Sequence, residues 1–491
     1  MRFDAPKPLR AVLFALCVLS GSLVGGAASV GDALDLPDMG NSADAVLTLT
    51  EQRELGQEFM KWVRKSLDVS EDPLLTDYVQ SLGRKLVAAS RDTRGRYDFF
   101  VVEDPRINAF AGPSGNIGVN AGLILAAETE SELAAVMAHE VAHVSQRHLL
   151  RAFAAQKQMT IPATALLIAA AVLGATVDSQ VGTAALMGLQ GAMVQRQINF
   201  TRANEEEADS IGIDTLARAG HDPYAMPGFF NKLTKANRVY ESGAPELLRT
   251  HPVTSDRIAD AMARAERFGH SQRPDSLRFH LTRAHLRERS YNRAEQAIGH
   301  FKNTLARGRY RNETAERYGY ARALARAGSL GDAAEQLAPL IEKHPSQVEL
   351  VVLQAELDRR RGAADKAARD LKSAVGLAPG SWPLQQAYAE ALLDAGRPAE
   401  ALATLERLVA LRPDITPVYQ IMADAAGKVG DAGAAMRWRA EYLYRSGDLE
   451  PAVRQLELAL RQPGLDFHLA SKIQVRLAEL RTEEQSRKKP R

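Results

Sequence analysis

The stretch His139-Glu140-Val141-Ala142-His143 decides how this chain is interpreted. It has the form H-E-x-x-H and lies within residues 131–153, which contain neither proline nor glycine and are predicted to be helical. On a helix, residues i and i+4 project from one face, so the two imidazoles can hold one zinc ion. The glutamate between them can then act on water at that metal. The alternative is a pair of ordinary surface or core histidines, which is the weaker interpretation because the chain has only 11 histidines in 491 residues.

Length and composition indicate a globular protein of more than one domain. A chain of 491 residues exceeds one ordinary hydrophobic core. Hydrophobic residues make up 45% and charged residues 25%, which is usual for a globular protein. The formal net charge is only +2, so nothing in the composition points to nucleic acid as a partner.

The N-terminus has the pattern of a secretory signal peptide at residues 1–28. A basic region precedes an apolar stretch at 11–24, and the small residues that follow predict cleavage after Ala28. A retained membrane anchor is the alternative, but the stretch is short for a span. Cys17, the only cysteine, lies in this segment, so the mature chain would have no thiol. Its zinc ligands must then be histidine and carboxylate, as in catalytic sites.

Zinc held by two histidines needs a third protein ligand and an open fourth position. Glu205 is the leading candidate, on a predicted helix at 203–219 that begins 60 residues after the motif ends. Asp209 is four residues further on, so it shares a face with Glu205 and can hydrogen-bond a histidine ligand. Helical geometry directs Glu206 and Glu207 elsewhere. The alternative for Glu205 is a solvated acidic surface.

Three further histidines need separate interpretation. His251 lies in a Thr-His-Pro turn, where it is either an exposed or capping histidine or a member of the site. If its imidazole reached the zinc, it would take the open position and hold the enzyme latent. His148, five residues after His143, lies about 140° around a continuous helix and is excluded as a ligand. His221 follows Gly220, the expected end of a helix, and is interpreted as structural.

The remaining N-terminal segments predict a small sheet and its helices. Helices are expected at 48–67 and 72–90, a strand at 97–102, and two short strands at 107–120 around a Gly-Pro-Ser-Gly turn. An extended peptide could add to an exposed edge strand there. Residues 159–194 carry one formal charge. The first interpretation is one or two helices packed on the catalytic core. The second is a flap over the cleft, or a surface that touches membrane or unfolded substrate. The third is a transmembrane span.

The C-terminal part is periodic. Glycines and prolines recur every 34 residues and predict paired helices of the tetratricopeptide type. Gly447 follows half a repeat later, so one helix can serve two pairs. A degenerate first unit begins near Asp275. Residues 481–491 are expected to be a basic tail, with disorder from Ser486 to Arg491. The periodic residues are Gly328, Gly362, Gly396 and Gly430, with Pro345, Pro379 and Pro413.

These motifs together resemble a known family. The H-E-x-x-H stretch, Asn204–Asp209, Thr250-His251-Pro252, Asn108–Ala111 and Gly122–Ile124 are similar to the exported zinc metallopeptidases related to HtpX and the CAAX prenyl proteases. The BepA type, which joins such a domain to tetratricopeptide repeats, is the most similar, and the resemblance covers roughly residues 45–480.

The resemblance implies a role for each site residue. His139, His143 and Glu205 would be the zinc ligands, Glu140 the catalytic carboxylate and Asp209 the supporting acid. It also implies residence in a Gram-negative periplasm and action on unfolded or misfolded outer-membrane proteins. The repeats would bind the outer-membrane β-barrel assembly machinery.

We therefore expect a mostly α-helical chain. An α+β zincin-type metallopeptidase domain with a small β-sheet is predicted at 45–270, followed by a helical tetratricopeptide-repeat solenoid at 275–480. The predicted function is zinc-dependent endoproteolysis of misfolded or stalled outer-membrane β-barrel proteins, with help in their assembly. The alternative is a chaperone or assembly factor with a latent peptidase.

Within the predicted mechanism, Glu140 accepts a proton from water and later delivers it to the leaving amine. The donor that stabilises the oxyanion is not identified by any motif. Arg257 and Arg202 are candidates, although a surface salt bridge is the commoner role for such residues.

Overall fold

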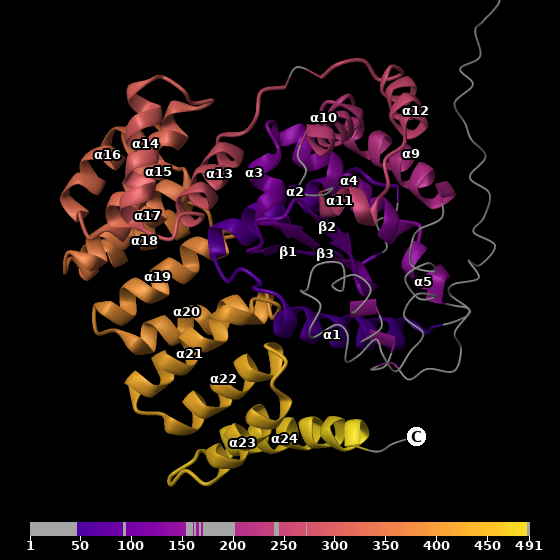
Figure 1. Cartoon of the computed structure of the whole chain (residues 1–491). Helices are drawn as coiled ribbons and strands as arrows, with labels where there is room; N and C mark the ends of the chain where they lie inside the picture. Colours follow the sequence, from indigo (N-terminus) through magenta and orange to yellow (C-terminus); the bar gives the residue numbers. More distant parts are fainter. Residues whose placement is uncertain are drawn as a thin grey trace, which may run out of the picture. The chain divides into compact units, whose positions relative to one another are not determined.

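The computed structural model describes residues 47–91, 95–153, 161, 164–165, 168–169, 202–239, 245–271 and 273–488. These residues are mostly helical and include one three-stranded sheet, as predicted (Figure 1). The predicted signal peptide at 1–28 lies outside them, as does nearly all of the apolar segment at 159–194. Among the described helices, none combines the length and the apolar character that a membrane crossing requires.

The sheet consists of β1 (Asp98–Val102), β2 (Ala109–Ala111) and β3 (Asn116–Asn120), in the order β1-β3-β2. β1 runs parallel to β3, and β2 runs antiparallel to it, so β2 is an outer strand. The Gly-Pro-Ser-Gly turn forms the short helix η1 (Pro113–Gly115) between β2 and β3. The two strands predicted around this turn are therefore confirmed.

Helices pack around this sheet and form the core of the N-terminal domain (Figure 1). The core is made by apolar side chains of α2 and α4 against those of β1 and β3. Every residue of α4 from Leu133 to His143 is buried, and apart from His139, Glu140 and His143 all of them are apolar. The helices are α1 (Leu49–Ser66), α2 (Pro73–Ala89), α3 (Ala121–Ala126), α4 (Glu130–Ser145), α5 (His148–Phe153), α9 (Arg202–Arg218), α10 (Ala225–Val239), α11 (Glu246–Thr250) and α12 (Ser255–Ala265).

The helix predicted to run through 131–153 is interrupted, so that prediction is wrong in its extent. α4 ends at Ser145 and α5 begins at His148. Between them, Arg147 has a φ of 53°, in the left-handed region that residues other than glycine rarely adopt. No proline or glycine marks this break in the sequence. Tertiary contacts of His148, described below, outweigh the local helix propensity there.

The C-terminal helices form the predicted pairs. All four periodic glycines have positive φ, from 71° to 92°, and each ends the first helix of a pair. α22 packs against both α21 and α23, so one helix does serve two pairs. The helices are α13 (Leu277–Arg289), α14 (Ala294–Ala306), α15 (Glu313–Arg326), α16 (Leu330–Lys343), α17 (Val348–Arg360), α18 (Ala364–Leu377), α19 (Trp382–Asp394), α20 (Pro398–Leu411), α21 (Thr416–Val429), α22 (Ala432–Arg445), α23 (Leu449–Leu460) and α24 (Phe467–Lys488).

α13 joins the two regions because it is apolar on two sides. Phe279 and Leu286 belong to the core of the N-terminal domain, whereas Leu281 and Ala284 belong to the core of the first repeats. Arg278 on the same helix extends the junction with ion pairs to Asp77 of α2, at 2.8 Å, and to Glu349 of α17, at 3.0 Å.

The C-terminal end differs from the prediction of a tail at 481–491. α24 continues to Lys488, and residues 489–491 lie outside the described part. Ile473, Leu477 and Leu480 are buried and hold this helix against α23. An ion pair between Arg481 and Glu457, at 2.7 Å, continues the contact beyond the apolar residues. Packing of one face therefore extends the helix into a segment whose composition is polar.

Candidate metal centre

The two motif histidines face each other on α4. Both are 2% exposed, and their Nε2 atoms lie 3.0 Å apart. α9 packs directly against α4 and brings Glu205 to the same point. The Glu205 carboxylate oxygens lie 3.4 Å from the Nε2 atom of His139 and 3.4 Å from that of His143. A Cβ at Gly212 of α9 would be 3.3 Å from the backbone nitrogen of His139, so this glycine permits the close approach of the helices.

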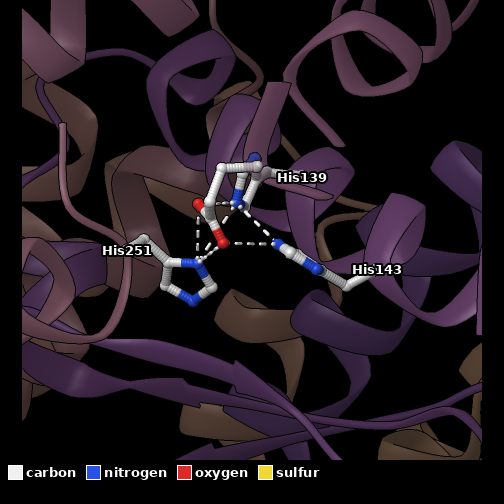
Figure 2. Close-up of side chains that lie close together, drawn as sticks. His139, His143 and His251 are labelled. Carbon is white, nitrogen blue, oxygen red and sulfur yellow. Dashed lines mark hydrogen bonds and ion pairs between the residues drawn. The ribbon is translucent and has the colours of Figure 1, made fainter. Parts of the chain in front are cut away.

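His251 completes the cluster from a different direction. It is the C-cap residue of α11 and is 5% exposed, so it is not a surface histidine. Its Nδ1 atom lies 3.3 Å from Nε2 of His139 and 3.1 Å from Oε1 of Glu205. Figure 2 shows the rings of His139, His143 and His251 directed toward one common point. Together with Glu205 they offer four ligand atoms, all within 4.8 Å of one another.

The chemistry of this donor set fits a divalent metal. Nδ1 of His139 lies 3.0 Å from Oδ1 of Asp209, so this carboxylate favours a proton on Nδ1 and leaves Nε2 facing the cluster. Lone pairs that converge at such distances repel one another unless a cation lies between them. In the absence of a metal, burial lowers the pKa of His139, but Asp209 and Glu205 outweigh burial and raise it to about 10, so a proton on Nε2 takes the place of the cation. The site therefore stabilises positive charge, and nitrogen and carboxylate donors suit zinc.

Glu140 lies beside the cluster and does not belong to it. It follows His139 by one residue, about 100° around α4, and is 1% exposed. Its Oε1 atom is 3.5 Å from Nε2 of His251. Burial raises the pKa of Glu140, against the opposing effects of His251, His139 and the backbone amide of Ala111. A carboxyl group with a raised pKa is suited to accept and return a proton near neutral pH.

Arg257 of α12 is buried, so the expectation of a surface salt bridge is wrong. It is 1% exposed and forms two hydrogen bonds to Asp209, from Nε at 2.8 Å and from Nη2 at 2.9 Å. Nη1 lies 3.0 Å from Glu205 and donates to the carbonyl of Pro252 at 2.7 Å. Its donors are thus directed at the acids that support the cluster and not at an oxyanion. Arg202, the other candidate, is exposed at the start of α9.

Sequence reasoning missed His148 and Glu207. Nδ1 of His148 lies 2.8 Å from Nδ1 of His143, and Nε2 of His148 lies 3.0 Å from Oε2 of Glu207. His148 is not among the four clustered ligands, which agrees with its exclusion, but the argument from a continuous helix does not hold because α4 and α5 are separate. The available signal was a third histidine close to the motif and an acid two residues after Glu205. His221 is buried and accepts from Lys85 Nζ at 3.1 Å, as a structural histidine would.

Comparison with known proteins identifies the family. Two family models match the chain: Peptidase family M48 over residues 73–265, and Tetratricopeptide repeat over residues 359–425. The Beta-barrel assembly-enhancing protease of Escherichia coli (strain K12) is 35% identical over 372 residues, which make up 76% of this chain and 76% of that protein. The protein of that name in Yersinia pestis is 34% identical over 369 residues, 74% of this chain and 75% of that protein.

Other relatives match a smaller part. A Vibrio cholerae protein is 41% identical over 274 residues, and the chain spans 56% of its length. Mitochondrial metalloendopeptidase OMA1 of Arabidopsis thaliana is 29% identical over 231 residues, 45% of this chain and 43% of that protein. The peptidase match includes the H-E-x-x-H helix and the helix that carries Glu205. The chain therefore belongs to peptidase family M48, as a metallopeptidase that is joined to tetratricopeptide repeats.

Proposed function

We propose that this chain is a periplasmic zinc-dependent endopeptidase that degrades misfolded or stalled outer-membrane β-barrel proteins. The observation that carries the proposal is the convergence of His139, His143 and Glu205 on one point, with the buried Glu140 beside it. The relatives named for β-barrel assembly support the substrate class, and the predicted signal peptide supports the location.

In this proposal His139, His143 and Glu205 hold the zinc, and Asp209 holds His139 in the tautomer that presents Nε2. When bound, zinc acts as a Lewis acid that polarises the scissile carbonyl and makes water more acidic. Glu140 accepts the proton of the attacking water and returns it to the amine that leaves. Burial raises the pKa of Glu140, which makes the second step, in which it acts as an acid, easier.

We propose that substrate binds in an extended conformation along β2. This strand pairs with β3 on one side only and is an outer strand among those that the structure describes. It ends at Ala111, whose backbone amide is close enough to Glu140 to influence its pKa. Hydrogen bonds from a strand edge bind main-chain groups, so such a site tolerates many sequences, as unfolded chains require.

His251 supports a second candidate function, in which the peptidase is latent. Its Nδ1 atom is within the ligand cluster, so it would occupy the coordination position that water needs. In that state the protein would act mainly as a chaperone or assembly factor that binds unfolded outer-membrane proteins, and the β-barrel assembly machinery, through its repeats. Solenoid repeats present extended surfaces that suit such partners.

The test is cleavage of an unfolded outer-membrane β-barrel protein by the full chain loaded with zinc. Glu140→Gln should keep zinc and the fold but lose about 100-fold or more in turnover, since general-base catalysis contributes at least that much. Glu132→Gln, on the same helix and away from the cluster, is the matched control and should retain activity. Equal cleavage by wild type and Glu140→Gln would refute the peptidase proposal. If wild type and both variants bind the substrate and none cleaves it, the chaperone function is favoured.

A further inference from the structure

We infer that His148 and Glu207 position the metal ligand His143, by selecting the ring tautomer in which Nε2 presents its lone pair to the metal. This inference rests on the proposed metal site. Neither residue reaches the cluster itself, so both act through His143 and are positioning residues.

The contacts form a short chain in which the two histidines are buried. Nδ1 of His143, the nitrogen that faces away from the cluster, lies 2.8 Å from Nδ1 of His148. Nε2 of His148 then lies 3.0 Å from Oε2 of Glu207. The side chains of His143 and His148 are 1% and 0% exposed, and their rings meet edge-on with centroids 4.8 Å apart. Glu207 is at the rim, with its side chain 39% exposed.

The direction of the hydrogen bonds follows from the carboxylate. Glu207 only accepts, so Nε2 of His148 carries the proton in this contact. In a neutral imidazole the other nitrogen is then an acceptor, so Nδ1 of His148 accepts from Nδ1–H of His143. His143 with its proton on Nδ1 has the lone pair on Nε2, and that atom lies 3.4 Å from Glu205 within the cluster. This assignment of protons leaves Nε2 of His143 available to bind a metal.

The break between α4 and α5 makes this contact possible. In a continuous helix, a residue five positions after His143 would lie about 140° away from it. The left-handed Arg147, with a φ of 53°, ends α4 and redirects the chain so that His148 faces back toward His143. A non-glycine residue rarely adopts this conformation, so the surrounding contacts must compensate for its strain.

The two motif histidines have different partners at Nδ1, the nitrogen that faces away from the cluster. Nδ1 of His139 lies directly beside Asp209, 3.0 Å from Oδ1. Nδ1 of His143 instead contacts Nδ1 of His148, which in turn contacts the carboxylate of Glu207. Metal-bound histidines are commonly held by a carboxylate or carbonyl at the second nitrogen, and removal of that partner typically weakens metal binding 10–100-fold. His148 and Glu207 together thus correspond to Asp209 on the other side of the cluster.

The experiment measures metal binding by the full chain, not peptidase activity. Zinc affinity is determined by competition with a chromophoric chelator, and the ligand-field absorption of the cobalt(II)-substituted protein reports the geometry. His148→Leu should weaken zinc 10–100-fold and alter the cobalt spectrum. His148→Gln restores an acceptor oxygen near Nδ1 of His143 and should recover part of the affinity.

Glu207→Ala has a matched control one residue away. Glu206 is exposed and carries the same charge, so Glu206→Ala changes the net charge equally without touching the chain of contacts. Glu207→Ala should weaken zinc, whereas Glu206→Ala should not. Wild-type affinity and an unchanged cobalt spectrum in His148→Leu would overturn the inference.

The stability of the metal-free protein distinguishes a packing role of His148 from its positioning of His143. If His148→Leu and His148→Gln lose affinity equally and unfold at equally reduced urea concentrations without metal, His148 only fills space and the inference fails. His143→Ala tests the underlying site. If that variant binds zinc as wild type does, the proposed metal site itself is wrong, an outcome distinct from failure of the inference about His148.

Discussion

Arg257 binds Asp209 through two parallel hydrogen bonds, with Nε 2.8 Å from Oδ2 and Nη2 2.9 Å from Oδ1. Oδ1 of Asp209 also lies 3.0 Å from Nδ1 of His139. A guanidinium from α12 therefore holds an acid of α9, and that acid in turn holds a histidine of α4. Planar, two-point contacts of this kind fix orientation as well as charge.

Removal of the Arg257 guanidinium should destabilise the fold strongly. Arg257→Leu leaves Asp209 and Glu205 as buried acids without their cation, which costs about 3–5 kcal/mol. Arg257→Lys keeps the charge but loses the two-point contact, so its effect should be intermediate. Urea unfolding of the chelator-treated protein measures the difference. The control is Arg264→Ala on the same helix, where a hydrogen bond to Ser210 is lost, and a loss below about 1 kcal/mol is expected. An equally small loss in Arg257→Leu would contradict the prediction.

Substitution of His251 should increase peptidase activity. Nδ1 of His251 lies within the ligand cluster and Nε2 lies 3.5 Å from Glu140, so the ring occupies space that water and substrate need. His251→Ala should raise turnover about tenfold, equivalent to about 1.4 kcal/mol of activation free energy. Arg249→Ala, an exposed change on the same helix, should leave turnover unchanged. A His251→Ala variant that retains zinc but cleaves no faster would exclude the latency role.

His221 should make the protein less stable in mild acid. Burial, with the Lys85 charge nearby, lowers the pKa of His221 to about 4, against about 6.5 in an unfolded chain. The unfolded state therefore takes up a proton first, so stability is complete above about pH 6.5 and is lost as the pH falls toward 4. The loss attributable to this group between pH 7 and pH 5 is about 2 kcal/mol.

The measurement for His221 is urea unfolding of the metal-free protein at these two pH values. His221→Gln should reduce the difference between them by about 2 kcal/mol. His270→Gln is the control, because the side chain of His270 is 64% exposed and should leave the difference as in wild type. An unchanged pH dependence in His221→Gln would show that His221 is not the group responsible.

Two glycines in the repeats should respond oppositely to alanine. Gly396 has a φ of 71° between α19 and α20, so Gly396→Ala should cost about 1–2 kcal/mol despite the open space around it. Gly299 lies within α14 and is also open, so Gly299→Ala should gain about 0.5–1 kcal/mol. Denaturant unfolding of both variants measures the signs. A stabilising Gly396→Ala would show that the turn adopts another conformation in solution.

Local patterns predicted the parts of the site that depend on one helix. His139 and His143 share a face because they are four residues apart, and Glu205 and Asp209 do so for the same reason. The repeat helices were equally accessible, since a 34-residue period places a left-handed glycine at each turn.

What the sequence determined by itself was therefore the chemistry on each helix and the periodic architecture of the C-terminal region, because both arise from interactions between near neighbours. Only the tertiary structure decided that His251 enters the cluster, that Arg257 is buried against Asp209, and that α4 breaks so that His148 meets His143. These arrangements depend on contacts between elements far apart in the chain. Their net stabilisation outweighs local preferences such as the helix propensity of residues 146 and 147, and no short stretch of sequence encodes that balance.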